Sequence, residues 1–146
     1  MITTRQAISS DDEAPTLEPV RSRMRITAER IGLQAIRAIV HDFYANVRRD
    51  PVLGPRFETI IQDWPAHEAK LTHFWWGALG GPVYARYRYR VVDTHQLIDV
   101  ESHEIERWLA LFTDCLRARL PASEADEWLG RAHAMGGSLT QAVGCR

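Results

Sequence analysis

The feature that most constrains the fold is a helical spacing of apolar residues that recurs in four stretches of the chain. Within each stretch, apolar side chains follow one another mainly at steps of three and four residues, which places them on one face of a helix. Nothing in the pattern supplies a convincing pair of strands that would form a sheet. The sequence therefore predicts an all-α fold with four substantial helices and one short helix.

The four apolar faces are the basis for every later expectation about the interior. They consist of Ile36, Ile39, Val40, Phe43, Tyr44 and Val47; of His67, Leu71, Phe74, Trp75 and Ala78; of Ile105, Trp108, Leu109, Phe112, Cys115 and Leu116; and of Trp128, Leu129, Ala132, Met135, Leu139 and Val143.

Capping and helix-breaking residues predict where these helices begin and end. The Thr27 hydroxyl is expected to cap the first helix, which should end near Asp50 because a proline follows. Asp63 is expected to cap the second helix, and the Gly-Gly-Pro run at 80–82 to end it. The Leu-Pro pair at 120–121 separates the third helix from the fourth.

Composition limits the classes of function. The chain has 146 residues, of which 45% are apolar, so a single domain can bury a core without disulfides. Eighteen basic and nineteen acidic side chains give a net charge of −1, which argues against nucleic acid as a partner. The longest nearly uncharged run, at 74–83, is much shorter than the about 20 residues of a membrane span. A soluble protein with a small ligand is expected.

The N-terminal segment and the cysteines indicate the domain boundary and the cellular compartment. Residues 1–25 are rich in Ser, Asp, Glu, Pro and Arg without an apolar period, so we expect a mobile tail followed by one domain over 26–146. The N-terminus lacks the pattern of a secretory signal, and Cys115 and Cys145 lie far apart. Reduced thiols and a cytoplasmic location are the expectation.

Polar residues that interrupt the apolar faces point to an interior pocket. Tyr44, His67 and Trp108 each lie on the inward face of a different helix. His95 lies on the apolar side of the short helix expected over 91–98. Taken alone, each of these residues would be interpreted as an ordinary core residue. Together, two histidines on either side of a Gly-Gly-Pro break are placed to flank a flat cofactor.

Three segments together resemble the truncated haemoglobins of group III. They are F-Y-A-N-V-R-R-D-P-V-L-G-P-R-F at 43–57, W-P-A-H-E-A-K-L-T-H-F-W at 64–75, and R-W-L-A-L-F at 107–112 with His95 before it. The resemblance covers residues 26–143. It implies a shortened globin, a two-over-two helical sandwich, that holds haem b (iron protoporphyrin IX) without a covalent bond.

The resemblance also implies roles for individual residues. His95 matches the proximal iron ligand, Tyr44 and Trp108 the distal hydrogen-bond donors, and Phe57 the phenylalanine that packs on the haem. His67 matches the distal histidine, which either gates ligand entry or binds the ferric iron. The expected cofactor-binding set is His95, Tyr44, His67, Trp108, Phe57, Leu71, Val92, Ile98, Phe112 and Arg88, with His95 as the metal ligand.

Other histidines are weaker candidates for the proximal ligand. His103 lies at the entry of the next helix, and His73 lies off the apolar face of its own helix, so His95 is the better choice. His73, His41 and His133 are expected at the surface or on helix flanks.

Arginine and tyrosine alternate from Tyr84 to Val92, a segment expected to be a loop. One or two of Arg86, Arg88 and Arg90, or Tyr87, are placed to meet the haem propionates, because a guanidinium pairs well with a carboxylate. The alternative for each of them is a solvated position.

The function implied is binding of O₂, CO and NO. A pocket rich in donors retains a ligand, which suits NO or peroxide detoxification, redox chemistry or sensing better than oxygen transport. An enzyme of this kind would be a haem-dependent dioxygenase or peroxidase-like protein. It would need a separate reductase, because the chain lacks flavin and nicotinamide motifs. The alternative is a cofactor-free globin-like sensor or interaction domain. A di-iron bundle is excluded by the absence of Glu-x-x-His.

Overall fold

The computed structural model describes residues 25–89 and 99–144. Regular structure within these ranges is helical throughout, without a strand, which confirms the all-α prediction. The short helix expected over 91–98 and the first 24 residues of the tail expected over 1–25 lie outside the described residues. The helices are α2 (Thr27–Ile31), α3 (Leu33–Arg49), α4 (Gly54–Ile60), α5 (Trp64–Ala78), α7 (Ser102–Arg119) and α8 (Ala122–Gly144).

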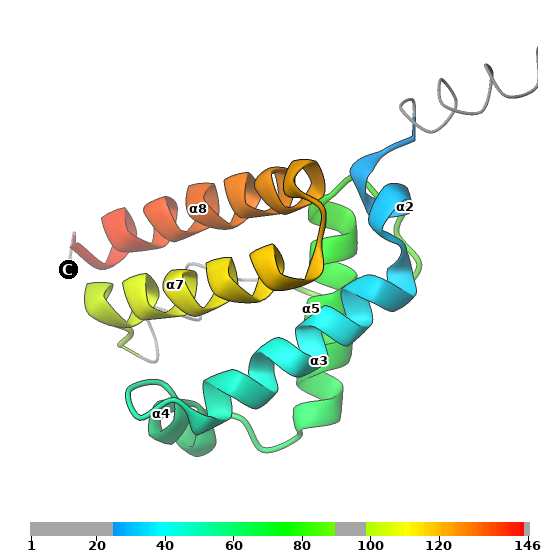
Figure 1. Cartoon of the computed structure of the whole chain (residues 1–146). Helices are drawn as coiled ribbons and strands as arrows, with labels where there is room; N and C mark the ends of the chain where they lie inside the picture. The colour runs from blue at the N-terminus through cyan, green and yellow to red at the C-terminus, as the bar shows by residue number, and fades with distance from the viewer. Residues whose placement is uncertain (1–24, 90–98, 145–146) are drawn as a thin grey trace, which may run out of the picture.

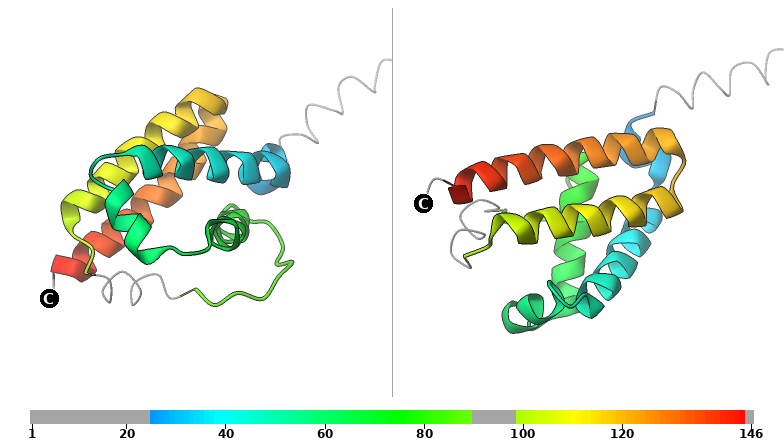
Figure 2. Two further views of the ribbon diagram at one scale, coloured as in Figure 1. Left: turned by 90° about the horizontal axis from the view of Figure 1, so that it is seen from below. Right: turned by 60° about the vertical axis from the view of Figure 1, so that its left-hand side comes forward.

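Two pairs of helices form the body of the molecule (Figure 1). Helices α7 and α8 run antiparallel side by side, joined by the tight turn at 120–121, and α3 crosses α5 to form the other pair. The two pairs meet where α3 packs against α7. Figure 2 shows this layered arrangement from two further directions, one of them nearly along α5. The short helix α4 follows α3 and lies at the end of its pair.

A cluster of aromatic rings fills the space between the pairs. Phe112 on α7 packs with ring-centroid distances of 5.5 Å against both Trp75 of α5 and Trp128 of α8. Phe43 of α3 approaches Phe112 edge to face at 4.8 Å. All four side chains are at most 2% exposed. Large rings from four helices therefore form one continuous core, and their burial is the main stabilising contribution.

The first predicted helix is divided into two. Gly32 has φ +93°, a backbone conformation that residues other than glycine rarely adopt, and it separates α2 from α3. The prediction that the Thr27 hydroxyl caps this helix was wrong, because α2 begins at Thr27 and that hydroxyl donates to Glu127 of α8 instead. The Ala28 amide, one of the free amides at the helix start, donates to the Leu79 carbonyl at the end of α5 (3.1 Å).

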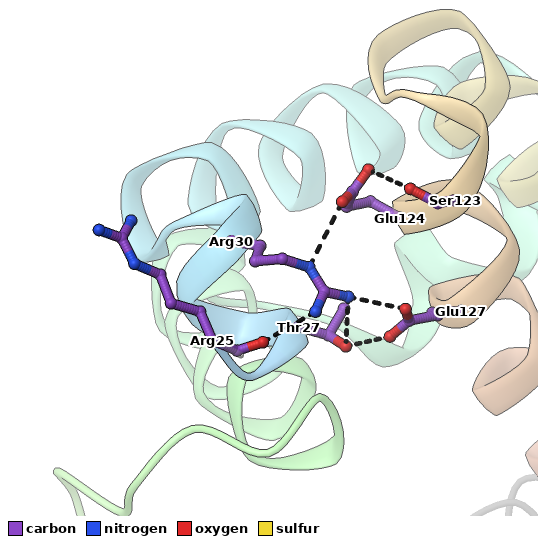
Figure 3. Close-up of polar contacts among 6 residues, drawn as sticks. All are labelled: Arg25, Thr27, Arg30, Ser123, Glu124 and Glu127. Atoms are coloured by element: carbon purple, nitrogen blue, oxygen red, sulfur yellow. Dashed lines mark hydrogen bonds and ion pairs between the residues drawn. The ribbon is translucent and has the colours of Figure 1, made fainter. Parts of the chain in front are cut away.

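Arg30 fastens α2 to α8 (Figure 3). Its guanidinium donates to Glu127 at 2.7 Å, lies 3.4 Å from Glu124, and also donates to the Arg25 carbonyl at 2.8 Å. The pKa of Glu124 is lowered, first by a hydrogen bond from Ser123 and also by the charge of Arg30. Two helices that are distant in the sequence are thus joined through one arginine.

The end of α3 is fixed by a buried carboxylate. Helix α3 ends at Arg49, as the following proline predicted, and Asp50 is only 6% exposed. Asp50 accepts from the backbone amides of Val52 and Leu53 (3.1 and 3.0 Å) and from Nε of Arg107 on α7 (2.9 Å). The hydrogen bond from Arg107, followed by those from the backbone, holds the pKa of this carboxyl below its usual range.

Most other boundaries follow their sequence signals. Asp63 caps α5 by accepting from the Ala66 amide (3.0 Å), and α5 ends before the glycine pair. Helix α4 was not predicted, although its early proline is acceptable in a first turn.

Across residues 25–89 and 99–144, no helix combines the length and apolarity needed to cross a bilayer.

Replacing Asp50 with Asn should lower the free energy of unfolding at pH 7 by about 1–3 kcal/mol, the usual worth of hydrogen bonds to a charged group. The lowered pKa means that the carboxylate stabilises the fold above the pKa it has in the unfolded chain. That contribution is lost as the pH falls through the folded-state pKa. Urea unfolding should therefore separate the two proteins at pH 7 and bring them together in acid.

Asp126→Asn is the matched control, because the Asp126–Arg117 pair is exposed and contributes little. Equal losses in the two variants would contradict a special role for Asp50.

Candidate functional site

An apolar cavity of about 300 Å³ opens between the two helix pairs. This volume is at the lower end of the range typical of small-molecule sites. The side chains around it come from α3, α4, α5, α7 and α8 and are mostly aliphatic or aromatic. Its described lining consists of Tyr44, Leu53, Arg56, Phe57, Ile60, Ile61, His67, Lys70, Leu71, Phe74, Trp75, Tyr89, Val100, Glu104, Ile105, Trp108, Met135, Gly136 and Leu139.

Tyr44 and Trp108 bring two polar tips to this cavity from α3 and α7. Phe43 packs edge to face against both rings, at 4.9 Å from Tyr44 and 5.1 Å from Trp108, and so fixes their positions. Burial strongly raises the pKa of the Tyr44 phenol, and the neighbouring indole of Trp108 opposes part of that rise. Tyr44 is therefore a neutral hydroxyl at pH 7, with its own hydrogen available to donate.

His67 provides a third polar tip from the first turn of α5. Its ring lies 5.4 Å from that of Tyr44, nearly perpendicular to it. Its Nε2 atom is buried and has no hydrogen-bond partner among the described residues. Burial, followed by the nearby charge of Lys70, lowers the pKa of this imidazole. A buried ring nitrogen without a partner is costly in an apolar site, so it indicates a place where a ligand supplies the missing interaction.

The other described residues of the expected set differ in where they lie relative to the cavity. Phe57 and Leu71 line the cavity with the three polar residues. Phe112 is buried behind it, packed at 4.8 Å on the Trp108 ring, and supports the wall without lining it. Arg88 is exposed and is not part of the described lining, and the same is true of Arg86.

The predicted iron ligand lies outside the described residues. His95, Val92 and Ile98 all belong to the segment 90–98, so their role stays a prediction. His103, the alternative ligand, is exposed at the start of α7 and lies 3.1 Å from Glu101, away from the cavity. No group of three potential metal ligands occurs within 25–89 and 99–144.

The structure adds residues that the sequence did not single out. Lys70 lies one helical turn after His67 on the same face of α5, a spacing that is visible in the sequence. Arg56 donates to the buried Glu104 (3.0 Å), and both line the cavity. Gly136 lines it from α8, where a methyl group would come within 2.8 Å of Leu109.

His73 is the histidine that differs most from expectation. The sequence placed it off the apolar face of α5, at the surface or on a helix flank, yet it is only 5% exposed. The tyrosines of the segment after α5 cover it. His41 and His133 are exposed, as expected.

The fold and this site define a globin, and comparison with known proteins agrees. The family model of the bacterial-like globins matches residues 27–140, so the chain belongs to that family. Within it, the chain is a truncated haemoglobin of group III. It is 33% identical over 93 residues to the group 3 truncated hemoglobin ctb of Campylobacter jejuni, an alignment that covers 60% of this chain and 72% of that protein. Membership of the globin family indicates binding of haem and of a gaseous ligand.

His67 and His41 should titrate in opposite directions from an ordinary histidine. Burial lowers the pKa of His67, whereas a hydrogen bond to Glu68 raises that of the exposed His41. In the protein without added haem, imidazole NMR signals followed against pH should show His41 protonating first as the pH falls. Because the folded state disfavours the proton on His67, that residue should reduce stability as the pH falls below its unfolded-state value.

Glu68→Gln is the control for this titration. It should lower the pKa of His41 and leave that of His67 below the usual value. A His67 that titrates together with His41 would contradict the buried environment described here.

Proposed function

We propose that this chain holds haem b in the cavity between the helix pairs, with His95 as the proximal ligand, and binds O₂, CO and NO on the side of Tyr44, Trp108 and His67. The observation that carries the proposal is the convergence of the polar groups of Tyr44, Trp108 and His67 on a mostly apolar cavity, one of them a buried nitrogen without a described partner. Haem, when bound, would supply an iron that binds a diatomic ligand.

The described residues fit this cofactor. Phe57, Leu71 and Phe74 provide the apolar surface that a macrocycle needs, and they come from two different helices. Lys70 at the cavity edge supplies a positive charge for a carboxylate of the propionate kind. Arg56, the other cation of the described lining, is already bound to Glu104. The exposed arginines of the 84–89 segment are not part of that lining. Lys70 is therefore the better partner for a propionate.

Tyr44 and Trp108 would determine how long a diatomic ligand stays. Both donate hydrogen bonds inside a dry cavity, where such bonds are stronger than in water. The Tyr44 phenol stays neutral because burial raises its pKa, so it keeps a hydrogen that it can donate to a ligand. Slow release favours NO or peroxide detoxification, redox chemistry or sensing over bulk oxygen transport. Turnover would then take electrons from a separate reductase. A cytoplasmic location belongs to the same proposal.

Absorption spectra of His95→Ala and His103→Ala test the cofactor site. Wild-type protein reconstituted with hemin should show an intense tetrapyrrole band that shifts when CO is added to the reduced form. His95→Ala should lose stable haem retention, because the iron loses its protein ligand. His103→Ala should behave like wild type, since that side chain is exposed and away from the cavity.

A wild-type protein that never acquires the band would instead favour the cofactor-free sensor or interaction domain. Loss of haem in His103→Ala alone would show that the proximal iron ligand is His103 and not His95.

Tyr44→Phe and Trp108→Phe should each speed O₂ dissociation by about tenfold, the change that corresponds to roughly 1.4 kcal/mol of lost hydrogen bonding. Both substitutions keep an aromatic ring against Phe43, so the wall of the cavity is preserved. Stopped-flow displacement of O₂ by CO measures the rate.

Phe74→Leu is a control that changes the apolar lining and removes no donor. Rates that stay at the wild-type value in both donor variants would show that the distal assignment is incorrect.

A further inference from the structure

A polar cluster around the buried His73 borders the cavity and has no role in the function proposed so far. His73 extends from α5 beneath the segment that follows the helix, and its ring lies 4.6 Å from that of Tyr84 and 5.4 Å from that of Tyr87. The Tyr89 ring stacks near it at 6.1 Å. An imidazole that is only 5% exposed needs partners for both nitrogens.

The hydrogen bonds of this cluster define one arrangement of protons. The Tyr84 amide can only donate, and it donates to Nε2 of His73 (3.3 Å). A neutral imidazole then carries its hydrogen on Nδ1, which lies 2.7 Å from the Tyr89 hydroxyl and donates to it. The Tyr89 hydrogen is left free for the Lys70 carbonyl, 3.1 Å away. Every donor in this series of three hydrogen bonds, from the Tyr84 amide to the Lys70 carbonyl, thus has an acceptor.

Tyr89 connects this cluster to the cavity. Its ring is part of the cavity lining and packs edge to face on Phe74, another lining residue, at 5.2 Å. The Lys70 ammonium lies 5.7 Å from the centre of the same ring. The position of Tyr89 therefore sets one edge of the cavity and supports the side chain proposed to meet a propionate.

We infer that His73 is a positioning residue for the cofactor site: through its hydrogen bond to Tyr89 it holds that ring as the cavity edge beside Lys70 and so slows cofactor release. The inference rests on the proposed haem site for its functional consequence. The hydrogen-bond arrangement itself stands apart from the cofactor and can be tested without it.

A His73 variant set separates positioning from packing. His73→Phe keeps a ring against the three tyrosines but removes both nitrogens. His73→Asn places an amide nitrogen near the position of Nδ1 and nothing at Nε2. The control is His133→Phe, because His133 is an exposed histidine on α8.

Release of hemin to an excess of an acceptor globin is the first readout. His73→Phe and Tyr89→Phe should each speed release by about fivefold to tenfold, the change for one lost hydrogen bond. The double variant should be no faster than either single one, because both remove the same bond. His73→Asn should return release toward the wild-type rate, and His133→Phe should have no effect.

Hydrogen exchange of the Tyr84 amide, measured without haem, is the second readout. Exchange should accelerate in His73→Phe and also in His73→Asn, since neither has an acceptor at the Nε2 position. Imidazole NMR of the wild type should show His73 with its hydrogen on Nδ1. Wild-type exchange in His73→Phe, or the Nε2–H form, would overturn the hydrogen-bond arrangement even if haem never binds.

Unchanged hemin release in both His73→Phe and Tyr89→Phe would overturn the positioning role while leaving the proposed function intact. Additive effects in the double variant would do the same. Failure of the wild type to bind haem would refute the proposed function and, with it, the consequence for cofactor release.

Discussion

The packing of Phe43 determines where the polar groups of the cavity lie. Its ring meets Tyr44, Trp108 and Phe112 edge to face at 4.8–5.1 Å, so it joins α3 to α7 at the point where the two helix pairs touch. Edge-to-face contacts of this kind have a preferred geometry in addition to their burial. As a result, the hydroxyl of Tyr44 and the indole of Trp108 both reach the cavity.

Two carboxylates that are mostly withdrawn from water reinforce this arrangement one to two turns away along the same helices. Asp50 ties the turn after α3 to Arg107, the residue next to Trp108 in the sequence. Glu104, one turn earlier on α7, receives Arg56 from α4. Charge-assisted hydrogen bonds thus join α7 both to the turn after α3 and to α4, which carries Phe57, and the cavity wall is held by polar contacts at its rim.

The sequence predicted the elements better than the contacts between them. Apolar spacing identifies a buried face, and Tyr44, His67 and Trp108 interrupt such faces, so their place at the cavity followed from periodicity together with the globin resemblance. Spacing carries no information about partners far along the chain. The Thr27 hydroxyl bonds Glu127, exactly one hundred positions away, and no local rule distinguishes that bond from a cap.

His73 shows the same limit from the other direction. Its position off the apolar stripe was correctly identified, but that flank of α5 is covered by a segment without regular structure, and the alternation of tyrosine and arginine there does not show which helix the tyrosines contact. The break at Gly32 and helix α4 were missed because each depends on local backbone geometry that glycine and proline permit without requiring it.

The absence of a side chain at Gly136 has a consequence for how closely α8 approaches α7 beside the cavity. A methyl group there would come within 2.8 Å of Leu109, so glycine allows the backbone of α8 to lie against that side chain at the cavity wall. Residue 136 is remote from the hydrogen-bond donors in the sequence, and it contributes backbone where they contribute polar side chains. The approach of the two helices and the polar recognition of a ligand are therefore encoded at different positions.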